Sequence, residues 1–68
     1  MEKADLSVLT DLERRVLERV VAGDSQKHIA HALGISIGST KAAQRRAKWR
    51  MGARNIAHLS AIGARAGL

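Results

Sequence analysis

The sequence has no cysteine, no proline, no tyrosine and no phenylalanine, and its single aromatic residue is Trp49. The lack of cysteine excludes a disulfide scaffold, a thiolate zinc site and a cysteine nucleophile. No apolar run approaches the roughly 18 residues that a bilayer-spanning helix needs, and no apolar core of a signal peptide is present. We therefore expect a soluble, intracellular protein.

Acidic residues are absent from residues 25–68, although the whole chain carries six of them. All six lie in residues 1–24 beside four basic residues, so that stretch has a net charge of −2. The rest of the chain carries eight basic side chains and a net charge of +8. A solvated surface usually mixes both signs, and this one-sided charge therefore indicates a polyanionic partner.

The length of 68 residues allows one small domain. A domain of that size buries only about 60% of its unfolded surface, so its elements must pack closely. Hydrophobic residues make up 46% of the chain, which is too many for intrinsic disorder. Twelve alanines favour closely packed helices.

A first helix is predicted after a flexible leader over residues 1–8. Thr10 and Glu13 have the spacing of a capping box, and Gly23 is placed to end the helix in a left-handed conformation. The predicted apolar face consists of Leu12, Val16, Leu17, Val20 and Val21. The residues expected on the other side are Glu13, Arg14, Glu18 and Arg19.

A short second helix is predicted to begin after Asp24 or Ser25, either of which is a suitable cap, and to stop at Gly34. Its inner face is expected to consist of Ile29, Ala30 and Leu33. The turn continues through residues 34–36, where we expect a buried Ile35 to anchor it.

A longer third helix is predicted from a cap at Ser36 to about Met51. At 100° per residue, the core stripe consists of Thr40, Ala43, Ala47 and Met51. A basic row consists of Lys41, Arg45 and Lys48, and the other flank carries Arg46 and Arg50. Trp49 falls opposite the core stripe and is expected to be exposed or held in an intermolecular contact.

A fourth helix is predicted after Asn55, which is a good N-cap. One face is expected to consist of Ile56, Leu59, Ile62 and Ala66, and a second strip of small side chains consists of Ala57, Ala61 and Ala64. The whole pattern predicts an all-α domain of four helices.

The second and third helices with their glycine turn have the form of a helix-turn-helix. The third helix, at about 22 Å, fits a major groove about 12 Å wide. Its start offers the Ser36 and Ser39 hydroxyls to a phosphate. Lys41 and Arg45 are one turn apart and suit guanine edges, while Ala42 suits a thymine methyl group.

The chain resembles the LuxR/GerE-type DNA-binding domain of bacterial transcriptional regulators. The resemblance is carried by residues 9–17, 22–30, 33–36, 39–41 and 51–55, with Leu59 and residues 67–68. It implies a helix-turn-helix domain over residues 9–68 that binds double-stranded DNA sequence-specifically through a third, recognition helix. It also implies a transcriptional regulator in the bacterial cytoplasm, at the nucleoid, with a fourth helix that supports a weak homodimer.

Site residues follow from the resemblance and from the charge pattern. Base reading is expected at Lys41, Ala42 and Arg45. Phosphate contacts are expected at Gln26, Lys27, Ser36, Ser39, Arg46, Lys48 and Arg54. Dimerisation is expected at Ile56, Ala57, Ser60, Ala61 and Ala64. We expect no cofactor and no metal, since His28 and His31 alone are two ligands and do not make a site.

The chain departs from the family's pattern on the third helix. The family has Val, His and a large aliphatic residue where this chain has Thr40, Ala43 and Ala47. Ile37 and Gly38 replace polar residues of the family, and Trp49 replaces a surface polar residue. These departures shrink the core side of the helix.

Three other functions stay open at this point. Residues 33–41 with residues 46–48 are similar to region four of alternative sigma factors, which binds the promoter −35 element, but residues 52–55 favour the LuxR/GerE family. Trp49 and the altered third helix motivate a protein-interaction module, with RNA polymerase as one partner. A basic helix on a membrane surface needs bulky apolar residues opposite the charge, which the third helix lacks.

An enzyme is not expected, because no acid–base pair or activated nucleophile is present.

Overall fold

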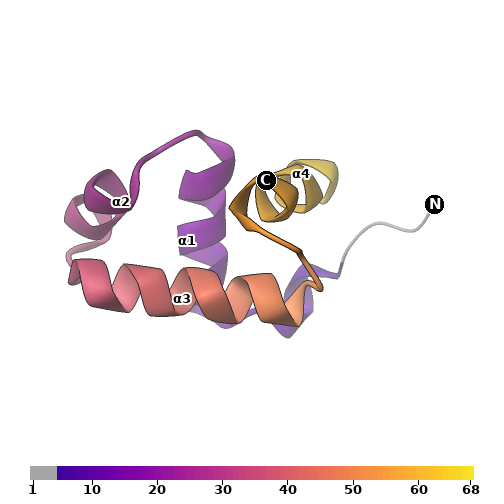
Figure 1. The fold of residues 1–68 in the computed structure, drawn as a ribbon, viewed down its shortest axis with the longest axis horizontal. Coiled ribbons are helices and arrows are strands. Elements are labelled where there is room, and N and C mark those ends of the chain that lie inside the picture. Colours follow the sequence, from indigo (N-terminus) through magenta and orange to yellow (C-terminus); the bar gives the residue numbers. More distant parts are fainter. Residues whose placement is uncertain (1–4) are drawn as a thin grey trace.

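The computed structural model describes residues 5–68, which form a 3-10 turn and four α-helices with no strand among them (Figure 1). The elements are η1 (Leu6–Val8), α1 (Asp11–Val21), α2 (Gln26–Leu33), α3 (Ile37–Arg50) and α4 (Ile56–Arg65). This arrangement confirms the predicted all-α, four-helix fold. None of the described helices has the length and apolar character to cross a membrane.

The helices begin at the predicted caps. The Thr10 hydroxyl accepts a hydrogen bond from the Glu13 amide at 3.2 Å, and the Glu13 carboxylate accepts one from the Thr10 amide at 3.1 Å. This pair is the predicted capping box, which satisfies two backbone donors at the start of α1. Ser25, Ser36 and Asn55 cap α2, α3 and α4 through their side-chain oxygens.

Two glycines end the first two helices in the left-handed conformation that glycine adopts without steric cost. Gly23 has φ +91° and Gly34 has φ +67°. After Gly34, the Ile35 amide donates to the Ala30 carbonyl at 3.0 Å, which closes the end of α2. Ile35, which was expected to be buried in the turn, is half-buried.

The core lies between α1 and the helices around it. Helix α1 packs against both α3 and α4, and α2 packs mainly on α3 (Figure 1). The buried cluster consists of Val16, Leu17, Val20, Ile29, Ala43, Ala47 and Leu59. Because alanine has a short side chain, Ala43 and Ala47 allow α3 to approach α1 closely.

Residues 5–8 of the expected leader take part in this packing. Leu6, in η1, and Leu9, which follows it, are half-buried against the core cluster. The Asp5 side chain caps η1 by accepting the Ser7 amide at 2.9 Å. Residues 1–4 of that leader lie outside the described residues.

One predicted helix face needs correction. Glu13, which was expected on the side opposite the apolar face of α1, is fully buried. It precedes Leu17 by four residues, and that spacing places it on the apolar face. Ile56, which was expected to share a face with Leu59 and to take part in dimerisation, is the first residue of α4 and is 40% exposed. The structure also buries Gln44 and Gly63, which had been assigned to no core position.

Candidate nucleic-acid interface

Helix α3 has one face that no other part of the described domain covers. We call this the outer face and define it by residues that span about 100° around the helix axis: Gly38, Lys41, Ala42, Arg45 and Trp49. All are exposed except Ala42, which is half-buried. The opposite side of α3 is buried through Thr40, Ala43, Gln44 and Ala47. The packing therefore directs the outer face to solvent.

A buried carboxylate with two arginine partners holds one flank of α3 against the start of α1. The Arg46 Nε atom lies 3.0 Å from one carboxylate oxygen of Glu13, and the Arg50 Nε atom lies 3.1 Å from the other. The carboxylate is fully buried, whereas the two guanidinium groups are about half exposed. Glu13 thus joins the helix cap at Thr10 to two arginines on α3.

The surroundings of Glu13 change the pKa of its carboxyl group. Burial alone raises the pKa of its carboxyl group. Hydrogen bonds from the Thr10 backbone and the Arg46 side chain, together with the charges of Arg50 and Arg46, outweigh burial and hold the pKa below its ordinary value. The carboxylate is therefore charged at neutral pH, and it neutralises part of the positive charge on this flank.

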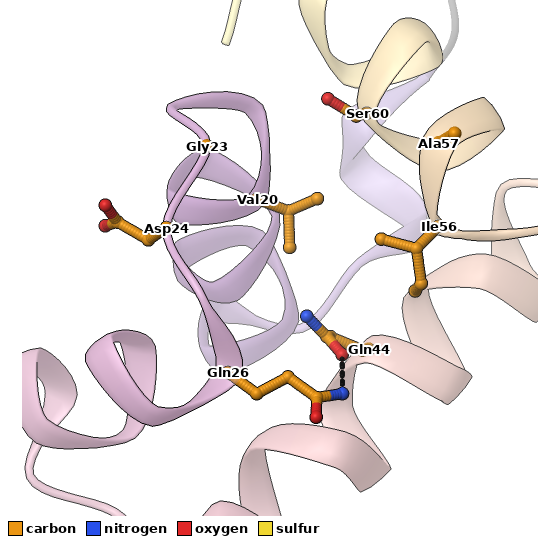
Figure 2. Close-up of a pocket in the computed structure, with 8 residues that line it drawn as sticks. All are labelled: Val20, Gly23, Asp24, Gln26, Gln44, Ile56, Ala57 and Ser60. Atoms are coloured by element: carbon orange, nitrogen blue, oxygen red, sulfur yellow. Dashed lines mark hydrogen bonds between the residues drawn. The ribbon is translucent and has the colours of Figure 1, made fainter.

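An amide pair holds the other flank of α3. The Gln26 Nε2 atom, at the start of α2, donates to the Gln44 Oε1 atom at 2.6 Å (Figure 2). Gln44 is 4% exposed, so this bond satisfies a polar group inside the helix-turn-helix. These contacts on both flanks, together with the buried side of α3, direct the outer face away from the core.

Cations without an acidic partner gather away from α1. The arginines at positions 14, 15 and 19 each pair with a carboxylate at 3.0–3.7 Å. Within residues 5–68, the basic side chains with no carboxylate within 4.0 Å are Lys27, Lys41, Arg45, Lys48, Arg54 and Arg65. Half of these lie on α3. Because ion pairs neutralise the arginines of α1, the remaining positive charge lies on the other part of the domain, as the charge distribution in the sequence predicts.

The residues expected to contact bases lie together on the outer face. Lys41 and Arg45 are exposed and one turn apart, and Ala42 lies between them in sequence and is half-buried. Helix α3 has 14 residues, which corresponds to about 21 Å. This is the surface of the domain with the shape and charge to enter a nucleic-acid groove.

The residues expected to contact phosphates fall into two groups. Lys27, Ser36, Ser39, Arg46 and Arg54 are exposed, while Gln26 and Lys48 are half-buried. Two of these side chains already have partners within the domain, since Arg46 pairs with Glu13 and Gln26 bonds to Gln44. The Ser36 hydroxyl accepts the Ser39 amide at 2.9 Å and donates to the Ser39 hydroxyl at 3.0 Å.

The start of α4 is held by two side-chain hydrogen bonds, of which the sequence analysis missed the one to the His58 ring. The Asn55 side chain accepts the His58 amide at 2.8 Å, and the His58 Nδ1 atom accepts the Arg54 amide at 2.9 Å. The signal available in the sequence was the three-residue spacing of Asn55 and His58, although the imidazole accepts the amide of Arg54, before the N-cap, and the pair is therefore not a capping box. His58 therefore has a structural role beside the exposed Arg54.

The residues expected to form a dimer line a shallow pocket in part. Ala57, Ala61 and Ala64 are exposed, and Ser60 is half-buried. The pocket, with a volume of about 340 Å³, is shown in Figure 2 and is lined by Val20, Gly23, Asp24, Gln26, Gln44, Ile56, Ala57 and Ser60.

Among the described residues, no three His, Cys, Asp or Glu side chains gather closely enough to hold a metal ion.

Comparison with known proteins gives one result for the chain. The GerE family model, described as bacterial regulatory proteins, luxR family, matches residues 7–62. The match includes the whole of α1, α2 and α3 and most of α4. No curated protein and no solved structure matches the chain significantly.

Proposed function

Because the chain belongs to the luxR family of bacterial regulatory proteins, whose helix-turn-helix domains bind DNA to regulate transcription, we propose that it binds duplex DNA sequence-specifically with the outer face of α3 in the major groove. The observation that carries this proposal is the pairing of exposure with charge on that face. Lys41 and Arg45 are exposed and have no carboxylate of residues 5–68 within 4.0 Å, while the flanks of α3 are held by the rest of the domain.

Each residue has a distinct role in this proposal. The Arg45 guanidinium donates two hydrogen bonds to the O6 and N7 atoms of one guanine, and Lys41 donates to a neighbouring base edge. Ala42 packs against a thymine methyl group. Lys27 and the serine hydroxyls at the start of α3 contact phosphates, which orients the domain without specifying sequence.

The test compares one base contact with one phosphate contact. Binding-site selection on random duplexes first gives a preferred site. On that site Arg45→Ala is expected to cost about 1–3 kcal/mol and to relax the choice of one base pair, because a bidentate contact is lost. Lys27→Ala removes the same charge and is expected to weaken preferred and random duplexes equally. Fluorescence anisotropy with both duplexes, at several salt concentrations, measures the two affinities.

Two results would count against the proposal. If Arg45→Ala weakens both duplexes by the same factor, Arg45 contacts phosphate only and the face that contacts bases lies elsewhere. If the unsubstituted domain binds no duplex at moderate salt, the family's DNA-binding activity is absent from this chain. In that second case a protein-interaction module becomes the better explanation.

The expected homodimer is the second part of the proposal. We infer that two copies pair weakly through α4, because Ala57, Ala61 and Ala64 are small and exposed along one helix and the available area is too small for a stable free dimer. Sedimentation is expected to show monomers at micromolar concentration and two copies on a palindromic duplex.

Ala61→Glu is expected to prevent the second copy from binding the palindromic duplex. Ala22→Glu adds the same charge at an exposed alanine outside α4 and is expected to leave the two-to-one complex intact. One-to-one binding by the unsubstituted domain on every duplex would contradict pairing through α4.

A further inference from the structure

Trp49 is the chain's only aromatic residue, and it is 82% exposed. Tryptophan is highly buried on average in folded proteins, and its large flat ring is enriched at interfaces. In the described residues no other large hydrophobic side chain is exposed to more than 45%. Trp49 therefore stands out as a side chain that the fold leaves available for contact with another molecule.

The position of Trp49 places it on the same face as the cations of α3. It follows Arg45 by one helical turn and differs from it by about 40° around the helix axis. It follows Ala42 by two turns and differs from it by about 20°. Since the Glu13 and Gln26 contacts hold the flanks of α3, any molecule that covers Arg45 lies next to the indole ring.

We propose that Trp49 is a positioning residue for the duplex, with its indole ring packed on a deoxyribose and its Nε1–H group donating to a phosphate oxygen. This inference rests on the proposed function. Trp49 lies 12 residues after Ile37, or about 18 Å along α3. The major groove curves around the duplex axis, so a straight helix of this length diverges from the groove floor at its ends. The last turn of α3 therefore meets the sugar–phosphate wall and not the base edges.

Charge decides which molecule fits against Trp49. The ring is next to Lys48 and Arg50 in sequence and one turn from Arg45, and residues 25–68 contain no acidic residue. A second copy that docked with this same face would bring like charges together, which costs free energy. A polyanion satisfies the cations and offers a flat apolar sugar to the indole ring.

The experiment uses the single tryptophan as its own reporter. Acrylamide, a neutral quencher, measures the accessibility of Trp49 in the free domain and in the domain saturated with its selected duplex. We expect high accessibility in the free domain and a fall of severalfold on the duplex. Trp49→Ala is expected to weaken binding about tenfold, at the low end of the range known for aromatic side chains that stack on bases, because a sugar offers less contact than a base. Trp49→Phe keeps a ring without the N–H donor and is expected to recover part of that loss.

The expected loss is the same on selected and random duplexes, because a sugar–phosphate contact carries no sequence information. Circular dichroism checks that Trp49→Ala keeps the helical content of the parent. The inference is overturned if the parent binds duplex while Trp49 stays fully accessible and Trp49→Ala binds as tightly as the parent, a result that leaves the proposed function intact. It is also overturned if the ring becomes shielded at rising protein concentration without DNA, which indicates a contact between copies. Failure of the parent itself to bind any duplex counts against the proposed function.

Discussion

The Glu13 carboxylate, at the start of α1, accepts a hydrogen bond at 3.0 Å from the Arg46 Nε atom on α3, 33 residues later in the chain. Arg50 adds a second ion pair to the same carboxylate. One buried side chain therefore caps α1, anchors α3 and fixes the rotation of α3 about its axis. That rotation decides which residues of α3 form the outer face.

Glu13→Gln is expected to destabilise the domain by about 1–3 kcal/mol, because a charged hydrogen-bond acceptor is lost while two arginines remain beside it. For a domain of this size, each kcal/mol corresponds to a fall of about 4–8 °C in Tm. Glu18→Gln is the matched control, since Glu18 is paired with Arg14 at 3.7 Å on the exposed surface. We expect the control to change stability by less than about 1 kcal/mol. If the two substitutions lower the free energy of unfolding in urea equally, the buried carboxylate of Glu13 stabilises the domain no more than the exposed carboxylate of Glu18.

Stability is expected to fall in acid in a way that depends on Glu13. Its folded-state pKa is held below the ordinary value, so the unfolded state binds the proton more tightly. The ion pairs therefore contribute fully above about pH 5 and are lost as the pH falls toward the folded pKa. Urea unfolding from pH 7 to pH 3 measures this loss, and Glu13→Gln is expected to show a shallower slope over the acidic range. Hydrogen bonds from the Ser7 side chain and backbone also lower the pKa of exposed Asp5. Because the parent and the Glu13→Gln variant both keep Asp5, the difference between their pH profiles reports the contribution of Glu13.

Two glycine-to-alanine substitutions are expected to act in opposite directions. A Cβ atom on Gly63 comes within 2.7 Å of Val21 Cγ2 and 3.1 Å of Leu17 Cδ1, so Gly63→Ala forces α4 away from α1. We expect a net loss of about 1–2 kcal/mol after the gain in helix propensity. A Cβ atom on Gly38 meets only Ser36 Oγ at 3.8 Å, and Gly38→Ala is expected to stabilise α3 by about 0.5–1 kcal/mol. Thermal unfolding of both variants measures the contrast, and the same sign for both would contradict the close approach of α1 and α4.

The hydrogen bond between Gln26 and Gln44 is expected to couple α2 to α3. Gln26→Ala, Gln44→Ala and the double variant form a double-mutant cycle. Because the bond is short and Gln44 is buried, we expect a coupling free energy of about 0.5–1.5 kcal/mol in urea unfolding. A coupling near zero would mean that the two amides contribute to stability independently of each other.

Many features of this protein could be predicted from short stretches of sequence. The caps at Thr10, Ser36 and Asn55 and the stop at Gly34 depend on residues within a few positions of one another, so helix boundaries follow from local chemistry. The exposure of Trp49 also followed from spacing along α3 alone. Even the burial of Glu13 was present in its spacing to Leu17, although its charge led to the opposite prediction.

Which side chains from different helices meet depends on how the helices pack, and local sequence does not specify it. Helical spacing places Glu13 on the apolar face of α1 but does not say that Arg46 and Arg50 satisfy its charge. The same holds for Gln26 and Gln44, whose amides meet only because α2 and α3 cross at the angle that their turn imposes. Local sequence therefore specifies the helices and the sign of the surface charge. Packing selects the outer-face cations that have no carboxylate partner among residues 5–68, because an ion pair requires two charges to lie within a few ångströms.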